Sequence, residues 1–303
     1  MAKYLLGWEL GANRGHLVRM ADVARRLAAE GHEVVLAAQR LSRDFDLPPN
    51  VQLWQAPIWP RLLGNVGALG GPMPNTMGDI LVRVGLDIPG TLPVLVEAWR
   101  RMLDAVLPDA VAADFAPALL CAARGRVPTL AMGLAFDSVP GHLAEFPSLT
   151  GQPAAYGEAG VLAAVNASMA ATGLDPLAHL PQMFAADHAL AGTFVELDVY
   201  AKWRREPVVA PSVAHPVGEA GAGDEVFLYA DAALLRTPAL WDGLARSGLP
   251  VRVHAQGASQ AQQAELARMG FKVEPAPIPF ARIAERSRVV MTYGGLGFVS
   301  SAL

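Results

Sequence analysis

Strand-length apolar runs alternate with longer amphipathic segments along almost the whole of this 303-residue chain. At its start, the apolar run at 4–10 leads through a glycine-flanked turn to an amphipathic segment, and a second apolar run follows at 33–38. In the amphipathic segment, apolar residues recur every three or four positions, which is typical of one face of a helix, and Gly31 closes it. A strand, a helix and a second strand in this order predict the βαβ unit of a parallel sheet.

The alternation continues through the first two thirds of the chain. The sequence predicts strands at 51–56, 110–114 and 128–133 and helices at 92–106, 117–125 and 158–172. The intervening stretch RLLGNVGALGGPMPNTMG, at 61–78, is rich in glycine and proline, so we expect a mobile loop there rather than core.

A stretch rich in proline, glycine and alanine at 206–224 predicts a linker. Beyond it, short strands and helices alternate again, from VFLYA at 226–230 to VVMTYGG at 289–295. The predicted fold is therefore α/β, with two Rossmann-like doubly wound domains at 1–205 and 225–303.

Composition excludes several classes of protein. With 52% hydrophobic and 17% charged residues, the chain has ample material for a core and does not have the composition of a disordered protein. A net charge of −4 argues against a nucleic-acid partner. The apolar run at the start is short and meets Glu9, and we find no stretch of the ~20 apolar residues that a membrane span needs. One cysteine, Cys121, in an apolar stretch predicts a buried, reduced thiol and suits a cytoplasmic protein.

Ligands of parallel α/β sheets bind where the strands end and the next helices begin, which draws attention first to WELGANRGH. Gly11 and Gly15 flank the turn, and His16 stands at the first turn of the helix. Helix N-termini favour anions and lower the pKa of a nearby histidine, so a neutral imidazole there is suited to act as a general base. The alternative is that His16 only caps the helix.

Asp114 ends a predicted strand of the same sheet, immediately before a helix. If the two strand ends adjoin, a carboxylate at this position can bond the far ring nitrogen of His16, fix its tautomer and stabilise the imidazolium. Aspartate is also among the best helix N-caps, so a purely structural role is the alternative, and the two roles are compatible.

The segment TYGGLGF is the third place where a strand feeds a turn and a helix. Gly294, Gly295 and Gly297 would let the backbone approach a diphosphate closely. The alternative is a tight turn without a ligand, because a glycine-rich turn alone is a weak signal. The other histidines show no metal-ligand spacing, and neither an HExxH nor a GxSxG motif is present, so the sequence predicts no metal site.

Three segments together resemble bacterial glycosyltransferases of the GT-B fold, the superfamily of the macrolide and flavonoid glycosyltransferases and the UDP-glucuronosyltransferases. They are GANRGHLVRMADVARRLAAEGHEVVLAA near the start, PDAVAADFAPALLCAARGRVP in the middle and VVMTYGGLGFVSSAL at the end. Each motif alone is weak, but three in the right order and spacing are fairly specific.

The resemblance implies transfer of a sugar from a nucleotide-diphosphate sugar, such as a UDP- or TDP-sugar, to an acceptor hydroxyl, with no bound metal or other cofactor. The acceptor would bind the first domain and the nucleotide the second, with reaction in the cleft between them. His16 aligns with the general base and Asp114 with the carboxylate that supports it. The expected donor-binding residues are Gly15, Tyr293, Gly294, Gly295, Gly297 and Phe298.

The chain also departs from the family pattern. Tyr293 replaces the family's histidine, and Phe298 replaces a serine or threonine. The family continues beyond this point with a segment that holds the nucleotide and the sugar. We therefore expect a second domain that is truncated, with exposed apolar surface that would favour a homodimer.

Segments 59–77 and 136–157 are rich in proline, glycine and aromatic residues, and we expect them to line a pocket for an apolar or lipid-like acceptor. Such loops also serve as simple surface covers. Two other functions stay open: a non-catalytic binding or auxiliary protein that retains the acceptor cleft, and, less favoured, a nucleotide-sugar epimerase. The epimerase needs several carboxylates around the sugar, and the closing motif supplies none.

Overall fold

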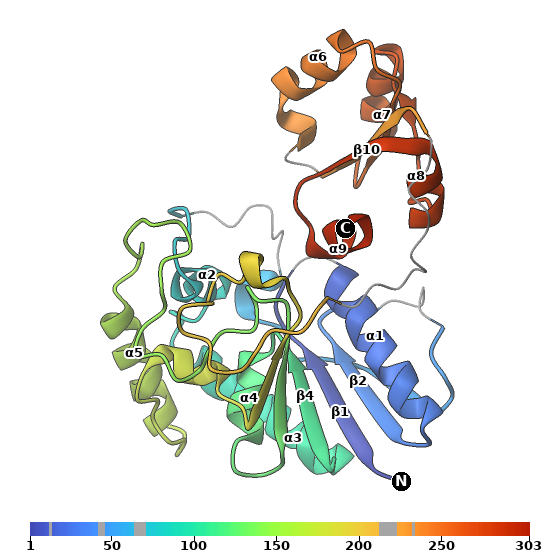
Figure 1. The fold of residues 1–303 in the computed structure, drawn as a ribbon. Coiled ribbons are helices and arrows are strands. Elements are labelled where there is room, and N and C mark those ends of the chain that lie inside the picture. Colours follow the sequence, from blue (N-terminus) through green and yellow to red (C-terminus); the bar gives the residue numbers. More distant parts are fainter. Residues whose placement is uncertain (12–13, 42–45, 64–70, 212–222, 232–233) are drawn as a thin grey trace. The chain divides into compact units, whose positions relative to one another are not determined.

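The computed structural model describes residues 1–11, 14–41, 46–63, 71–211, 223–231 and 234–303 (Figure 1). The chain forms two compact units, Met1–Ala210 and Pro211–Leu303. Most of the predicted linker at 206–224 lies outside the described residues.

The first unit is built on a six-stranded, wholly parallel sheet with the strand order β3-β2-β1-β4-β5-β6. This order is that of a Rossmann sheet, so the predicted doubly wound α/β fold is confirmed. The strands are β1 (Lys3–Trp8), β2 (Glu33–Ala38), β3 (Val51–Gln55), β4 (Ala110–Asp114), β5 (Thr129–Gly133) and β6 (His188–Ala191).

Helices cover both faces of this sheet (Figure 1). They are α1 (Arg14–Ala29), α2 (Met77–Val84), α3 (Thr91–Val106), α4 (Pro117–Ala123) and α5 (Glu158–Ala170), with short 3₁₀ helices at Pro60–Leu62, Leu180–Phe184 and Val195–Leu197. Neighbouring residues of β1 point to opposite faces: Leu6 packs in the cluster with α1, and Leu5 in the cluster with α3 and α4. Burial on both faces explains why the strands read as continuous apolar runs.

The second unit contains a four-stranded parallel sheet with the order β10-β7-β8-β9. Its elements are β7 (Glu225–Ala230), a 3₁₀ helix (Leu234–Arg236), α6 (Pro238–Arg246), β8 (Val251–Ala255), α7 (Gln260–Arg268), β9 (Lys272–Val273), α8 (Phe280–Arg286), β10 (Ser287–Thr292) and α9 (Leu296–Ala302). Its core surrounds Val253, Trp241 and Phe271.

Besides the short 3₁₀ helices, helix α2 and strand β6 of the first unit were not predicted. Helix α2 begins inside the stretch expected to be a loop, of which residues 64–70 lie outside the described part. Its start carries a capping box, in which the Thr76 hydroxyl accepts from the Asp79 N–H and the Asp79 carboxylate accepts from the Thr76 N–H. Strand β6 is a four-residue edge strand of alternating burial without β-branched residues, so it carries little strand signal.

None of the helices in the described segments combines the length and the apolar character that crossing a membrane requires.

Candidate active site

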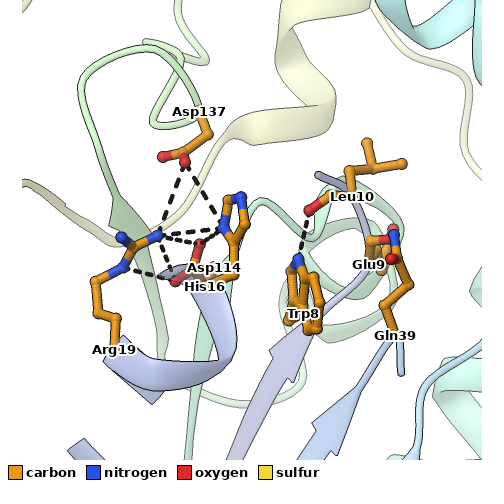
Figure 2. Close-up of polar contacts among 8 residues, drawn as sticks. All are labelled: Trp8, Glu9, Leu10, His16, Arg19, Gln39, Asp114 and Asp137. Atoms are coloured by element: carbon orange, nitrogen blue, oxygen red, sulfur yellow. Dashed lines mark hydrogen bonds and ion pairs between the residues drawn. The ribbon is translucent and has the colours of Figure 1, made fainter. Parts of the chain in front are cut away.

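His16 and Asp114 meet at the carboxyl end of the first sheet (Figure 2). Strands β1 and β4 are neighbours, and Trp8 pairs in register with Asp114. Helix α1 follows β1 directly, so its third residue, His16, lies over the end of β4. The distance from His16 Nδ1 to Asp114 Oδ1 is 2.8 Å. The proximity expected from adjoining strand ends is therefore present.

Arg19 lies one helical turn beyond His16 and binds the same carboxylate with two hydrogen bonds. Its Nε donates to Oδ2 of Asp114 at 2.7 Å, and its Nη2 donates to Oδ1 at 2.8 Å. Asp114 is completely buried, so this ion pair compensates a charge that water does not reach. Burial opposes the charged form of Arg19, but the neighbouring carboxylates outweigh it and raise the pKa of the guanidinium.

Asp137 is a second buried carboxylate in the same cluster, and the sequence interpretation missed it. It lies in the loop after β5, and its Oδ2 is 3.8 Å from both His16 Nδ1 and Arg19 Nη2. Burial, and then the negative charge of Asp114, raise the pKa of Asp137. The sequence did place Asp137 just beyond the end of β5, and β5 is the neighbour of β4 in the sheet. That position could have suggested a residue near Asp114.

The imidazole of His16 lies close to two aromatic rings. The indole of Trp8 stacks on it with a centroid distance of 5.5 Å and an interplanar angle of 12°, and the ring of Phe115 lies 6.1 Å away. The backbone of Phe115 has a φ of 47°, which is uncommon for a residue with a side chain and is a form of strain found near functional sites.

Gly11 approaches the other nitrogen of the histidine ring. Its φ is +96°, and a Cβ at this position would lie 2.3 Å from Nε2 of His16. Only glycine combines that backbone angle with this close approach. The turn that the sequence analysis singled out therefore brings its backbone against the free edge of the imidazole.

A mostly apolar pocket of about 330 Å³ is lined in part by neighbours of the histidine. Gly11, Phe115 and Phe136 line it, so the pocket wall is shared with the surroundings of the His16 ring. The remaining lining residues are Leu10, Gln39, Arg40, Leu62, Pro74, Ile80, Arg83 and Val84. The segments expected to line an acceptor pocket contribute Leu62, Pro74 and Phe136. Helix α2 supplies part of the wall that was not predicted.

His16, Asp114 and Asp137 together offer a nitrogen and two carboxylates of the kind that bind metal ions. One ligand atom from each lies within 4.8 Å of the others, which is close enough for a shared ion. However, the guanidinium of Arg19 already donates to both oxygens of Asp114. A metal ion would have to displace this internal cation, so the residues present do not fit a metal.

The predicted donor-binding residues other than Gly15 lie in the second unit, at the turn between β10 and α9 and in the first turn of α9. Gly294 has a φ of +92°, so the turn requires the conformational freedom of glycine there. The ring of Tyr293 lies 5.4 Å from that of Tyr229. Phe298 lies in an aromatic cluster, 5.4 Å from Tyr229 and from Phe280. In the first unit, Gly15 is exposed, and a Cβ there would meet no atom within 4 Å.

Comparison with solved structures identifies the architecture. The calicheamicin glycosyltransferase CalG4 matches with a TM-score of 0.64 at 17% identity, over 99% of this chain and 77% of that one. The glycosyltransferase VinC in complex with dTDP gives 0.58 at 15% identity, over 98% and 78%. UGT2 from Phytolacca americana, complexed with UDP-2-fluoroglucose and pterostilbene, gives 0.56 at 13%, over 100% and 78%.

No protein-family model matches the sequence, and the search of curated proteins gives no match. At these identities the structural likeness shows the fold and not the activity. The chain thus has the GT-B fold of the glycosyltransferases, as the resemblance of its three motifs implied.

Proposed function

We propose that this protein transfers a sugar from a nucleotide-diphosphate sugar to a hydroxyl group of an apolar acceptor. The observation that carries the proposal is the position of His16. One ring nitrogen lies 2.8 Å from Asp114, and the other faces Gly11 at the wall of an apolar pocket. A general base must lie within hydrogen-bond reach of the proton that it removes, and a pocket beside Nε2 offers a place for that hydroxyl.

In this mechanism the acceptor hydroxyl donates to Nε2 of His16. As the acceptor oxygen attacks the anomeric carbon and the bond from that carbon to the diphosphate breaks, the proton passes to Nε2. Asp114 accepts from Nδ1–H, which keeps Nε2 unprotonated beforehand and stabilises the imidazolium afterwards. General base catalysis of this kind contributes on the order of 10²- to 10⁴-fold to the rate.

The donor is assigned to the second unit, at the turn through Tyr293, Gly294 and Gly295. Two observations support this assignment: the turn follows the carboxyl end of a parallel strand, and structures of this fold have been solved with dTDP and with UDP-2-fluoroglucose. Gly297 and Phe298 belong to the same proposed site, and Gly15, in the first unit, stays a proposed donor-binding residue. UDP- and dTDP-sugars are therefore the first donors to test.

The test is an assay of the full chain with UDP- and dTDP-hexoses and a panel of planar phenols, with mass spectrometry as the readout. We expect a product heavier than the acceptor by one sugar residue. His16→Gln should abolish it, and Asp22→Asn, which removes an exposed carboxylate from the same helix, should not. Absence of both transfer and donor hydrolysis with the wild-type chain would refute the proposal.

A second candidate is a binding protein that keeps the acceptor pocket without transferring sugar. The observation that favours it is the packing of Phe298, at a position where the related pattern has a hydroxyl side chain. Its ring lies 6.1 Å from that of Phe227 and 5.4 Å from that of Phe280. The two candidates differ in one respect that can be measured. A binding protein retains its ligand in the His16→Gln variant, and its wild-type form turns over no nucleotide sugar.

A further inference from the structure

Nδ1 of His16 has two competing neighbours. It lies 2.8 Å from Oδ1 of Asp114, which can only accept a hydrogen bond, and 3.2 Å from Nη2 of Arg19, which can only donate one. The first contact favours a proton on Nδ1, and the second favours a lone pair there.

The choice between these tautomers decides whether the histidine can serve as a base towards the pocket. With the proton on Nδ1, Nε2 presents a lone pair on the side of Gly11. With the proton on Nε2, the lone pair points to Arg19 instead. Asp114 favours the Nδ1–H tautomer only weakly, because both of its oxygens already accept from the guanidinium, and the pair Asp114–Arg19 has no net charge.

Above its raised pKa of about 7, Asp137 adds a negative charge at the point where the balance between the two tautomers is decided. Its Oδ2 is 3.8 Å from both Nδ1 of His16 and Nη2 of Arg19. Its Oδ1 has no hydrogen-bond partner within the described part of the chain, and the side chain is almost completely buried. A charge in this position stabilises a proton on Nδ1 and attracts the guanidinium away from that nitrogen.

The loop that carries Asp137 is anchored independently of the cluster. The buried guanidinium of Arg204 donates to the carbonyl oxygens of Ser138 at 3.0 Å and Ala135 at 3.3 Å, and it pairs with the buried Asp198. Together with Tyr200, whose hydroxyl donates to the Phe136 carbonyl, these are the charged and titratable groups behind the loop. On the other side, a Cβ on Gly133 would lie 2.0 Å from Oδ1 of Asp137. The carboxylate is thus fixed against the cluster.

We propose that Asp137 is a positioning residue that holds His16 in the Nδ1–H tautomer by offsetting the competing donor Arg19. The effect of Asp137 on the tautomer is independent of the proposed function. The consequence of that effect for catalysis rests on the proposed function.

The test is long-range ¹⁵N–¹H NMR of the full ¹⁵N-labelled chain at alkaline pH, which distinguishes protonated from unprotonated ring nitrogens. The His16 signals are those that disappear in His16→Gln. In the wild type we expect Nδ1 to carry the proton. In Asp137→Asn we expect the ratio of tautomers to move toward Nε2–H by roughly tenfold, since a charge within 4–6 Å shifts a proton equilibrium by about one unit or more.

The double variant Arg19→Gln/Asp137→Asn separates this role from a structural one. If Asp137 acts by offsetting Arg19, removal of both restores the wild-type tautomer, and kcat/KM recovers with it. The ring signals of the other histidines report whether each variant is folded, and Asp22→Asn is the control for loss of an aspartate.

An unchanged tautomer in the folded Asp137→Asn variant would overturn the inference, as would a double variant that keeps the Asp137→Asn pattern. If the tautomer responds as expected but no nucleotide sugar is turned over, the positioning role stands and the proposed function fails.

Discussion

Nδ1 of His16 and Oδ1 of Asp114 lie 2.8 Å apart although 98 residues separate them in the chain. The sheet brings them together, because β1 and β4 are adjacent parallel strands whose carboxyl ends meet at one edge. His16 lies in the first turn of helix α1, and Asp114 ends strand β4. The position of the pair is therefore set by the rigid part of the first unit.

The first prediction concerns the dependence of these two residues on each other. His16→Ala should lower kcat by about 10²-fold or more, and Asp114→Asn by a similar factor, because the general base and its supporting carboxylate act together in one proton transfer. The double variant should lose little more than His16→Ala alone. Steady-state kinetics of the four proteins test this, with thermal melting to confirm that Asp114→Asn, which leaves Arg19 without its main partner, is folded. Losses that multiply would show that the residues act separately.

The second prediction concerns Gly11. In Gly11→Ala the new methyl group would lie 2.3 Å from Nε2 of His16, and the φ of +96° is costly for alanine. The imidazole must turn away from the pocket, so we expect kcat to fall by about 10²-fold, as in His16→Ala. Gly160→Ala in α5 is the matched control, because a Cβ there meets no atom within 4 Å. Wild-type kinetics in Gly11→Ala would contradict the proposed orientation of the ring.

Sequence alone predicted the alternation of strands and helices and the His16–Asp114 pair, because both depend on local pattern and on neighbouring strand ends. It did not predict Arg19 or Asp137 as members of the site. Arg19 read as one more charge on the polar face of α1, and Asp137 lies in a loop whose course no periodicity describes. Only the fold brings these side chains to within 3.8 Å of each other.

Helix α2 shows a different kind of failure. The glycines and prolines before it indicated a loop, yet Thr76 and Asp79 stand three residues apart as in a capping box. That spacing was the available signal. What it could not reveal is that the same Asp79 carboxylate accepts from the N–H groups of Ala155 and Tyr156, 76 and 77 residues further on.

The third prediction follows from this anchor. Burial tends to raise the pKa of Asp79, but its backbone N–H donors outweigh burial and hold the pKa below its ordinary value. The ionised form therefore stabilises the fold at neutral pH, and this contribution is lost as the pH falls below about 4. Asp79→Ala should lower the free energy of unfolding by about 3 kcal/mol at pH 7, because it leaves several donors unpaired. Urea denaturation measures the change.

The control for this measurement is Asp104→Ala, which removes an exposed carboxylate whose partner within the described residues is Arg126. It should change the free energy of unfolding by less than about 1 kcal/mol. If the two variants were equally stable, Asp79 would not anchor the loop to α2.

The last prediction concerns Glu9, which is completely buried. Its carboxylate accepts from the backbone N–H groups of Leu119 and Ala118 and from the indole N–H of Trp59. Burial outweighs these donors and raises its pKa to about 7. The folded state thus binds a proton that the unfolded state has already released, and the stability from this proton declines as the pH rises from about 4.5 to about 7.

The size of this effect follows from the difference between the two pKa values. It amounts to roughly 3 kcal/mol between pH 4.5 and pH 8, since each unit corresponds to about 1.4 kcal/mol. Glu9→Gln cannot ionise, so its free energy of unfolding should vary less across this range, whatever its stability at pH 4.5. Urea denaturation of both proteins at four or five pH values tests this. The direction is opposite to that expected for Asp79, whose contribution is lost toward acid. Equal pH slopes for wild type and Glu9→Gln would mean that Glu9 is ionised in the folded protein and that its three donors outweigh its burial.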